Sequence, residues 1–194
     1  DDFALGLLTP SAKRTKPCVL LMRTARGFVE SLDMHTFNTS KIVEDFNFLF
    51  SGCKSLKKLD ISNFDTSNAT GMGAMFSDCG MLEELDLKHF KTDKVVGMCQ
   101  MFQGCKSLKK INISSFNTEN VEAMIGMFYD CSSLEELDLS NFKTNKVTDM
   151  SQMFYGCTSL KKLDIASFDL SQKPYIDGII GACPNLKLEP NPFM

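Results

Sequence analysis

One residue type returns along this chain at a fixed interval, and this interval constrains the fold more than any other feature. Six cysteines follow one another at a single constant step: Cys53, Cys79, Cys105, Cys131, Cys157 and Cys183. Columns of leucine, phenylalanine and methionine keep the same step: Leu56, Leu82, Leu108, Leu134, Leu160 and Leu186; Phe64, Phe90, Phe116, Phe142 and Phe168; Met72, Met98, Met124 and Met150. A period of roughly 20 to 50 residues is typical of repeat proteins whose units stack into one continuous core. The sequence therefore predicts a solenoid.

Each unit contains a short segment with the periodicity of a β-strand. In one unit Leu85 and Leu87 flank Asp86, so that apolar and polar side chains alternate. Alternate side chains of a strand point to opposite faces, and a period of two therefore indicates a strand with one buried face. The pattern predicts a strand of about three residues in every unit.

A second apolar pattern follows each strand and has a different period. Its side chains are separated by three, three, one and three residues: Val95, Met98, Met101, Phe102 and Cys105. This spacing places them on one face of a short helix. The residue before each cysteine is Gly, Asp or Ala, types that largely tolerate the left-handed conformation in which helices often end. We expect each unit to be strand, turn, short helix, turn.

Neither element buries its apolar face alone, so the units have to stack strand upon strand, about 4.8 Å apart. Parallel stacking of this kind is right-handed by the crossover rule. The predicted fold class is an α/β repeat, a right-handed leucine-rich-repeat solenoid with short parallel strands on one face and short helices on the other.

Three regions are expected along the chain. Residues 32–169 hold five to six repeats of about 26 residues, and the first repeat carries one extra residue between Thr39 and Leu49. Residues 1–31 contain apolar clusters without the repeat spacing, and we assign them to an N-terminal cap. Residues 170–194 form a C-terminal cap repeat, because the terminal units of a solenoid have to shield the core from water.

The repeat units resemble a known family. The segments "CKSLKKLDISNFDTSNATGMGAMFSDC" and "CSSLEELDLSNFKTNKVTDMSQMFYGC" are similar to the BspA-like leucine-rich repeats of bacterial surface proteins, including mycoplasmal lipoproteins. The motifs "LDLSNF" and "MF-x-G-C" occur together in order, and the resemblance covers about residues 32–188. It implies a secreted or cell-surface location and a role in adhesion and in binding host or matrix components.

The exposed strand positions are the candidate ligand-binding surface. They form a mostly acidic column, which leucine-rich solenoids place on the concave side: Asp60, Asp86, Asn112, Asp138 and Asp164. Carboxylates stacked about 4.8 Å apart repel one another unless something offsets them. A bound cation or cationic ligand is one offset. The alternative is a hydrogen bond from a neighbouring backbone or hydroxyl group, such as that of Ser62, Ser114 or Ser140.

Charges beside this column alternate in sign from one repeat to the next. Two adjacent positions do so: Lys58, Glu84, Lys110, Glu136 and Lys162; and Lys57, Glu83, Lys109, Glu135 and Lys161. Opposite charges on neighbouring strands attract by roughly 0.2–1 kcal/mol per pair, and like charges destabilise. The alternation predicts the register of stacking and a true repeat of two units. It also indicates that these side chains neutralise one another.

The remaining chemistry-bearing residues point away from catalysis and from metal binding. The cysteine column lacks the C-x-x-C pairs of zinc sites, and a buried file of free thiols fits the spacing better. Cys18 and Cys99 lie outside the column and are expected to be unpaired. Of the two histidines, His35 and His89, neither has a repeated nucleophile or carboxylate partner. We therefore expect that the chain is not an enzyme and that it binds no cofactor and no metal ion.

Charge and hydropathy limit the classes of partner that the chain can bind. The net charge of −3 provides no basic footprint for nucleic acid, and the apolar stretches are shorter than the roughly 20 residues that span a bilayer. We expect a monomer that acts as a non-catalytic cell-surface or secreted recognition and adhesion module for a protein or glycan. The alternative is a structural spacer or protein-interaction segment of a larger protein.

Overall fold

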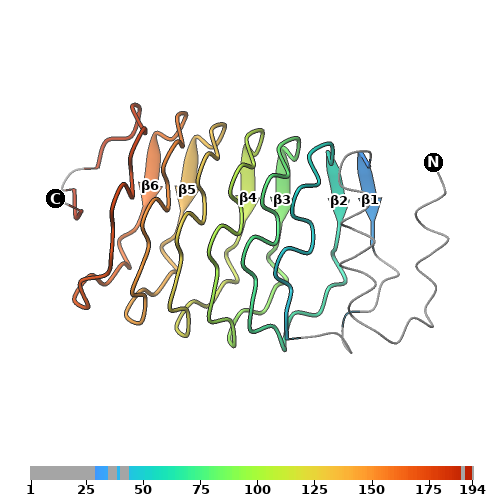
Figure 1. Ribbon diagram of the computed structural model, residues 1–194, viewed down its shortest axis with the longest axis horizontal. Helices are drawn as coiled ribbons and strands as arrows, with labels where there is room; N and C mark the ends of the chain where they lie inside the picture. Colours follow the sequence, from blue (N-terminus) through green and yellow to red (C-terminus); the bar gives the residue numbers. More distant parts are fainter. Residues whose placement is uncertain (1–28, 35–38, 40–43, 189–190, 194) are drawn as a thin grey trace.

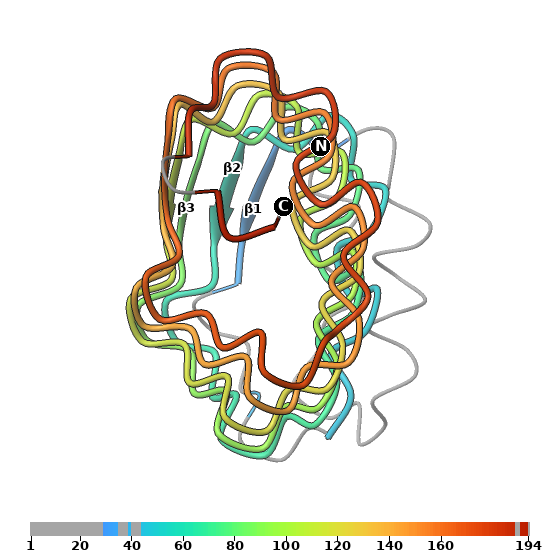
Figure 2. The ribbon, with the colours of Figure 1, turned by 90° about the vertical axis from the view of Figure 1, so that its left-hand side faces the viewer.

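The computed structural model describes residues 29–34, 39, 44–188 and 191–193. In this part of the chain each repeat makes one rung, and the rungs lie side by side along one axis (Figure 1). Seen along that axis, each rung has its strand on one side and a tightly winding segment on the opposite side (Figure 2). The predicted N-terminal cap lies almost entirely outside the described residues. The predicted C-terminal cap and the handedness of the winding stay predictions.

The strand of each rung has the predicted length. The described residues form six strands of three residues each: β1 (Ser31–Asp33), β2 (Lys58–Asp60), β3 (Glu84–Asp86), β4 (Lys110–Asn112), β5 (Glu136–Asp138) and β6 (Lys162–Asp164). In every strand the middle side chain is buried or half-buried and its two neighbours are exposed, as the period of two predicts. We call the surface made by these strands the strand face.

The strands pair in twos. Parallel pairing joins β1 to β2, β3 to β4, and β5 to β6, with Glu84 opposite Lys110 and Leu85 opposite Ile111 in the middle pair. Among the described residues no strand pairing joins β2 to β3 or β4 to β5, and these two intervals are visibly wider (Figure 1). The parallel stacking and the register are therefore confirmed within each pair of rungs, and the grouping of the strands in twos agrees with the two-unit repeat predicted from the charges.

The first rung is longer by one residue than the others. Leu32 pairs with Leu59, whereas the bridge from Asp45 to Gly71 spans a step that is one residue shorter. The extra residue therefore lies between Leu32 and Asp45. Thr39 bonds to a residue 26 positions later, whereas Thr66 bonds to one 25 positions later, so the extra residue follows Thr39, as the sequence predicted.

The predicted helices are wrong: none occurs in the residues that the structure describes. Residues 45–53 and the five segments that follow at the repeat interval form consecutive turns instead. Alternate N–H groups donate to carbonyls of the next rung at 2.8–3.1 Å, from Met98, Gln100, Phe102 and Gly104. The N–H groups between them donate three residues back, from Met101, Gln103 and Cys105. An α-helix needs every N–H for the carbonyl four residues back, so this segment cannot be helical.

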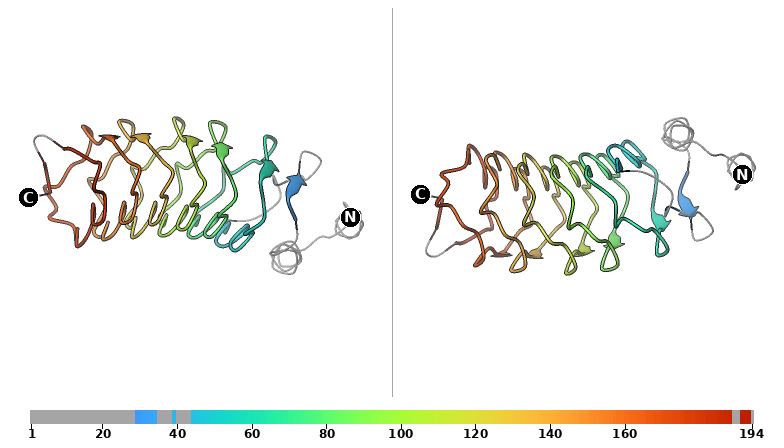
Figure 3. Two further views of the ribbon diagram at one scale, coloured as in Figure 1. Left: turned by 90° about the horizontal axis from the view of Figure 1, so that it is seen from above. Right: turned by 90° about the horizontal axis from the view of Figure 1, so that it is seen from below.

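Backbone conformation explains why the chain leaves the helical path here. Each segment has two residues with positive φ, such as Gln100 at 59° and Gly104 at 71°. A left-handed residue cannot continue a right-handed helix. The resulting turn face, residues 45–53 and its equivalents, carries an unbroken series of parallel bridges from rung to rung and runs along the stack opposite the strands (Figure 3). A spacing of three and four residues buries the same side chains in consecutive turns as in a helix, which is why the burial was predicted correctly.

The core consists of columns of identical side chains, as the repeat predicts. The cysteines form a file: the Sγ of Cys105 donates to the carbonyl of Phe76 at 3.2 Å, and the same bond recurs on four other rungs. None of the seven described cysteines forms a disulfide, and Cys99 is half-buried on the turn face. A second phenylalanine column stacks ring on ring, with centroids 5.3–6.0 Å apart: Phe50, Phe76, Phe102, Phe128 and Phe154.

A buried threonine column ties the rungs together between the two faces. The hydroxyl of Thr118 donates to the carbonyl of Lys143 at 2.8 Å and accepts the N–H of the same residue at 2.7 Å. Four other threonines each make an equivalent pair of hydrogen bonds: Thr39, Thr66, Thr92 and Thr144. One small side chain therefore satisfies both polar groups of a backbone residue on the next rung, where no strand pairing could do so.

Candidate functional site

The five predicted ligand-binding residues occupy equivalent places on the strand face. Asp60, Asp86, Asn112, Asp138 and Asp164 are the last residues of β2 to β6, and all are exposed. A groove crosses β3, β4 and β5 and includes three of them, Asp86, Asn112 and Asp138. Asp60 and Asp164 lie on the flanking strands outside its lining. The structure thus brings the middle of the predicted column into one concave site.

Each side chain of the column caps the turn that follows its strand. The Oδ1 atom accepts the N–H of the residue two positions later, at 2.9–3.3 Å. For Asp138 the donor is Ser140, whose hydrogen bonds hold the pKa of this carboxyl below its ordinary value. The Lys88 side chain and N–H do the same for Asp86, and the two side chains form an ion pair of 3.0 Å. Asp86 and Asp138 are therefore ionised at neutral pH, and one oxygen of each side chain in the column is committed to the turn.

Ion pairs join the strands that pair with each other. Lys109 and Lys110 of one rung contact Glu83 and Glu84 of the rung before, each at 2.8 Å. Equivalent pairs form between Lys161 and Glu135, Lys162 and Glu136, and Lys57 and Glu30. The hydrogen bond and charge of the partner lysine lower the pKa values of Glu83 and Glu135. The predicted neutralisation between neighbouring rungs is confirmed for these pairs.

The wide interval between β4 and β5 lies inside the groove and gives it two unlike walls. Lys109 and Lys110 belong to one wall, and Glu135 and Glu136 to the other. Each of these residues already has an ion-pair partner on the outer side, and no ion pair of the described strand face crosses this interval. Ile111 is half-buried here, whereas Leu85 and Leu137 are buried. The groove thus offers unpaired strand edges between a basic and an acidic wall.

The sequence did not predict this groove. Strand stacking was expected to be uniform, so no interval was expected to differ from the next. The charge alternation could not have located it, because opposite charges follow one another at every step and therefore attract across every interval alike.

The other residues considered for chemistry have structural contacts. His89 lies between rungs, with its Nε2 2.9 Å from the carbonyl oxygen of Ile61, while His35 and Cys18 fall outside the described residues. Within the described ranges no three His, Cys, Asp or Glu side chains are grouped so that they could hold a metal ion. No helix long and apolar enough to cross a membrane occurs in that part of the chain.

Solved leucine-rich repeat proteins share limited similarity with this chain. A leucine-rich repeat protein from Bacteroides ovatus ATCC 8483 has a TM-score of 0.37 at 18% identity, over 72% of this chain and 44% of that one. A leucine rich cell surface protein from Faecalibacterium prausnitzii A2-165 has a TM-score of 0.37 at 19% identity, over 60% and 35%. The T. pallidum leucine rich repeat protein has a TM-score of 0.34 at 18% identity, over 72% and 58%. The chain spans less than two thirds of each of these proteins.

A comparison with curated proteins found no match. A family model does match, twice and with overlap, at residues 21–111 and 80–190, and it is described as "Mycoplasma protein of unknown function, DUF285". The double match fits a chain built from repeats, and the family agrees with the mycoplasmal part of the resemblance. The specific BspA-like assignment stays a prediction. Because the two matches together cover most of the sequence, the chain belongs to this family of Mycoplasma proteins, DUF285.

Proposed function

We propose that the chain is a non-catalytic recognition module that binds an extended segment of a partner protein in the strand-face groove between β3 and β5. One observation carries this proposal: the groove contains unpaired strand edges between a lysine wall and a glutamate wall. An extended polypeptide carries both the backbone groups that suit a strand edge and side chains that suit the walls. A surface or secreted location and a role in adhesion follow from the family resemblance and belong to the same proposal.

The charges of the groove favour a partner segment with at least one basic side chain. Five carboxylates and two amino groups line it: Glu84, Asp86, Glu135, Glu136 and Asp138; Lys109 and Lys110. The glutamates are neutralised by lysines and Asp86 by Lys88, so Asp138 contributes most of the remaining charge. Internal neutralisation limits long-range attraction, and the contribution of the charges is therefore to specificity more than to affinity.

The test uses variants that remove charge without removing the turn cap. Asn112 shows that an asparagine at this position still caps the turn through Oδ1. Asp138→Asn and Asp86→Asn should therefore fold normally, and Asp164→Asn, which makes the same change outside the groove, is the matched control. The immobilised chain is offered extracellular-matrix proteins, and retained proteins are measured by surface plasmon resonance and by amide hydrogen exchange.

We expect Asp138→Asn to weaken binding roughly tenfold, or about 1.4 kcal/mol, with little change for Asp164→Asn. The bound protein should protect the amides of β4 and β5 from exchange. Equal loss in all three variants, or protection elsewhere, would refute binding in the groove.

The structural spacer is the second candidate function. The observation in its favour is that most charges of the strand face already contact one another, which leaves few for a partner. The spacer becomes the better account if no matrix protein is retained by the unmodified chain at micromolar concentration.

A further inference from the structure

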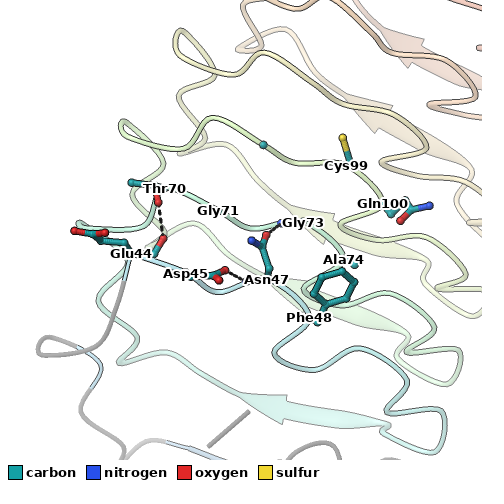
Figure 4. Close-up of a pocket in the computed structure, with 11 residues that line it drawn as sticks. Glu44, Asp45, Asn47, Phe48, Thr70, Gly71, Gly73, Ala74, Cys99 and Gln100 are labelled. Atoms are coloured by element: carbon teal, nitrogen blue, oxygen red, sulfur yellow. Dashed lines mark hydrogen bonds between the residues drawn. The ribbon is translucent and has the colours of Figure 1, made fainter. Parts of the chain in front are cut away.

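A second groove lies on the turn face, on the side of the solenoid opposite the strands (Figure 4). It spans the first three described turn segments. Its lining includes one aromatic ring, two carboxylates, two amides and several residues with little or no side chain: Phe48; Glu44 and Asp45; Asn47 and Gln100; Gly71, Gly73, Ala74 and Gly97. None of the described residues that line it is a lysine or an arginine. The groove is therefore open to ligands that do not need a positive charge.

Phe48 is an outlier that the fold does not require. Its φ is 61° and its side chain is 53% exposed, so a bulky residue adopts a disfavoured backbone conformation without gaining burial. The equivalent positions have the same positive φ but hold smaller or more flexible residues: Ala74, Gln100, Gly126, Gln152 and Gly178. An exposed, strained aromatic residue at the rim of a groove points to a role in binding, since folding alone would favour glycine there.

Gly97 is a second residue that folding does not explain. A Cβ atom added at this position would meet nothing within 4 Å, and its φ is not in the left-handed region. Of the equivalent positions, Gly71 is also a glycine, whereas those outside the groove carry side chains, namely Ala123, Asp149 and Tyr175. Glycine adds flexibility to the unfolded chain without any gain in packing here. What it does is leave the floor of the groove uncovered.

Asn47 is held in place by the rung next to it. Its Oδ1 accepts the N–H of Gly73, and its side chain lies so close to Gly71 that a Cβ there would be 2.6 Å from Nδ2. Figure 4 shows this amide lying along the groove between Asp45 and Phe48. The N–H of Asn47 also bonds the Oδ1 of Asp45 at 2.8 Å. The groove therefore contains an oriented amide donor beside carboxylate acceptors and an exposed ring.

We propose that this groove binds a neutral saccharide. A sugar ring has an apolar C–H face that stacks on Phe48 and hydroxyl groups that donate to Glu44 and Asp45 and accept from the Asn47 amide. The glycine floor lets the sugar approach the backbone closely. Anionic sugars are disfavoured, because the charged side chains among the described lining residues are two carboxylates. The site is on the opposite face from the proposed protein site and does not depend on it.

The experiment is a titration of the ¹⁵N-labelled chain with glucose, galactose, N-acetylglucosamine and lactose, followed by chemical shifts and saturation transfer. We expect at least one of these sugars to shift the amides of Asn47, Gly71 and Gly97. Phe48→Gly and Gly97→Leu should each weaken that binding at least tenfold. Tyr175→Ala and Ala123→Leu are the controls, as they change an exposed aromatic residue and the floor position outside the groove.

Stability separates binding from folding in the same variants. Phe48→Gly should raise Tm by about 2–4 °C, as expected when a left-handed conformation is relieved in a chain of this size, while it weakens sugar binding. Gly97→Leu should leave Tm nearly unchanged. The proposal is overturned if none of the four sugars shifts these amides, if sialyllactose binds as well as lactose, or if choline or a lysine peptide shifts them and the sugars do not. It is also overturned if Phe48→Gly lowers Tm.

Discussion

The buried threonine column provides the most direct test of how the rungs are joined. In Thr118→Val the side chain keeps its size, but both backbone groups of Lys143 lose their partner on the preceding rung. Each polar group left unsatisfied in a buried place costs about 1–3 kcal/mol, and these two are part-buried. We expect a loss of about 3 kcal/mol in the free energy of unfolding, which corresponds to about 6–12 °C in Tm for this size.

Urea unfolding followed by circular dichroism measures this loss, with two variants for comparison. Thr118→Ser keeps the hydroxyl and loses one buried methyl group, so it should cost only about 1 kcal/mol. Thr148→Val removes a single 3.1 Å hydrogen bond from an exposed side chain and should cost less than about 0.5 kcal/mol. If Thr118→Val and Thr148→Val agree within about 0.5 kcal/mol, water replaces the lost bonds and the column does not hold the rungs together.

The repeat period predicted the stacking, and the reason is that a column of identical side chains leaves few ways to pack. The cysteine file, the buried Phe64 column and the strand register all follow from one constant repeat interval. The turn face was not predicted, because apolar side chains three and four residues apart are buried equally well by a helix and by consecutive turns. The missed signal is the second tolerant column, where Gly126 and Gly178 lie four residues before Asp130 and Ala182.

The candidate site was predicted in its residues and not in its shape. The third position of each strand follows from the period of two, and this placed Asp86 and Asp138 on the exposed face. The groove depends on the unequal spacing of strands, which side-chain pattern alone does not determine. The saccharide groove could not be predicted either, because Phe48 and Gly97 depart from their columns in ways that matter only once φ and the surrounding space are known.

Three further predictions concern pH and metal. Burial raises the pKa values of Cys105 and Cys157 from 9.0 to about 12. The contribution of these thiols to the stability of the fold is therefore fully present below pH 9.0 and is lost as the pH rises towards 12. Urea midpoints should fall across this range, and the two thiols should resist Ellman's reagent at about pH 8. Lys109 and Lys161 lower the pKa values of Glu83 and Glu135. The contribution of these ion pairs to the stability of the fold is therefore present above about pH 4.5 and is lost as the pH falls below it. Glu83→Gln should flatten the fall in stability at acid pH. Excess calcium should leave Tm unchanged, since each Asp of the column has one oxygen committed to its turn, and a rise in Tm would show a cation site.

The two-rung repeat makes a prediction about deletions that opposes the usual expectation for solenoids. Where stability is a sum over neighbouring repeats, removing two rungs costs more than removing one. Deleting residues 79–104 here would place Lys57 and Lys58 beside Lys109 and Lys110. On the rung after Asp78, Asp130 would also take the place that Gly104 has in the intact chain. A Cβ atom at that place lies too close to the Oδ1 of Asp78. Like charges and a steric clash would then meet at one junction.

Deleting residues 79–130 avoids both problems, because Lys57 and Lys58 then lie beside Glu135 and Glu136. Asp78 is then followed by Gly156, a glycine that accepts Asp130 in the same way in the intact chain. The strand pairs β1–β2 and β5–β6 survive with their ion pairs. We therefore expect the shorter chain to melt at the higher temperature of the two, with calorimetry of both purified variants as the measurement. If the variant without residues 79–104 has a melting temperature equal to or higher than that of the variant without residues 79–130, the pairing of rungs does not contribute to stability. Stability is then a simple sum over equivalent neighbouring repeats.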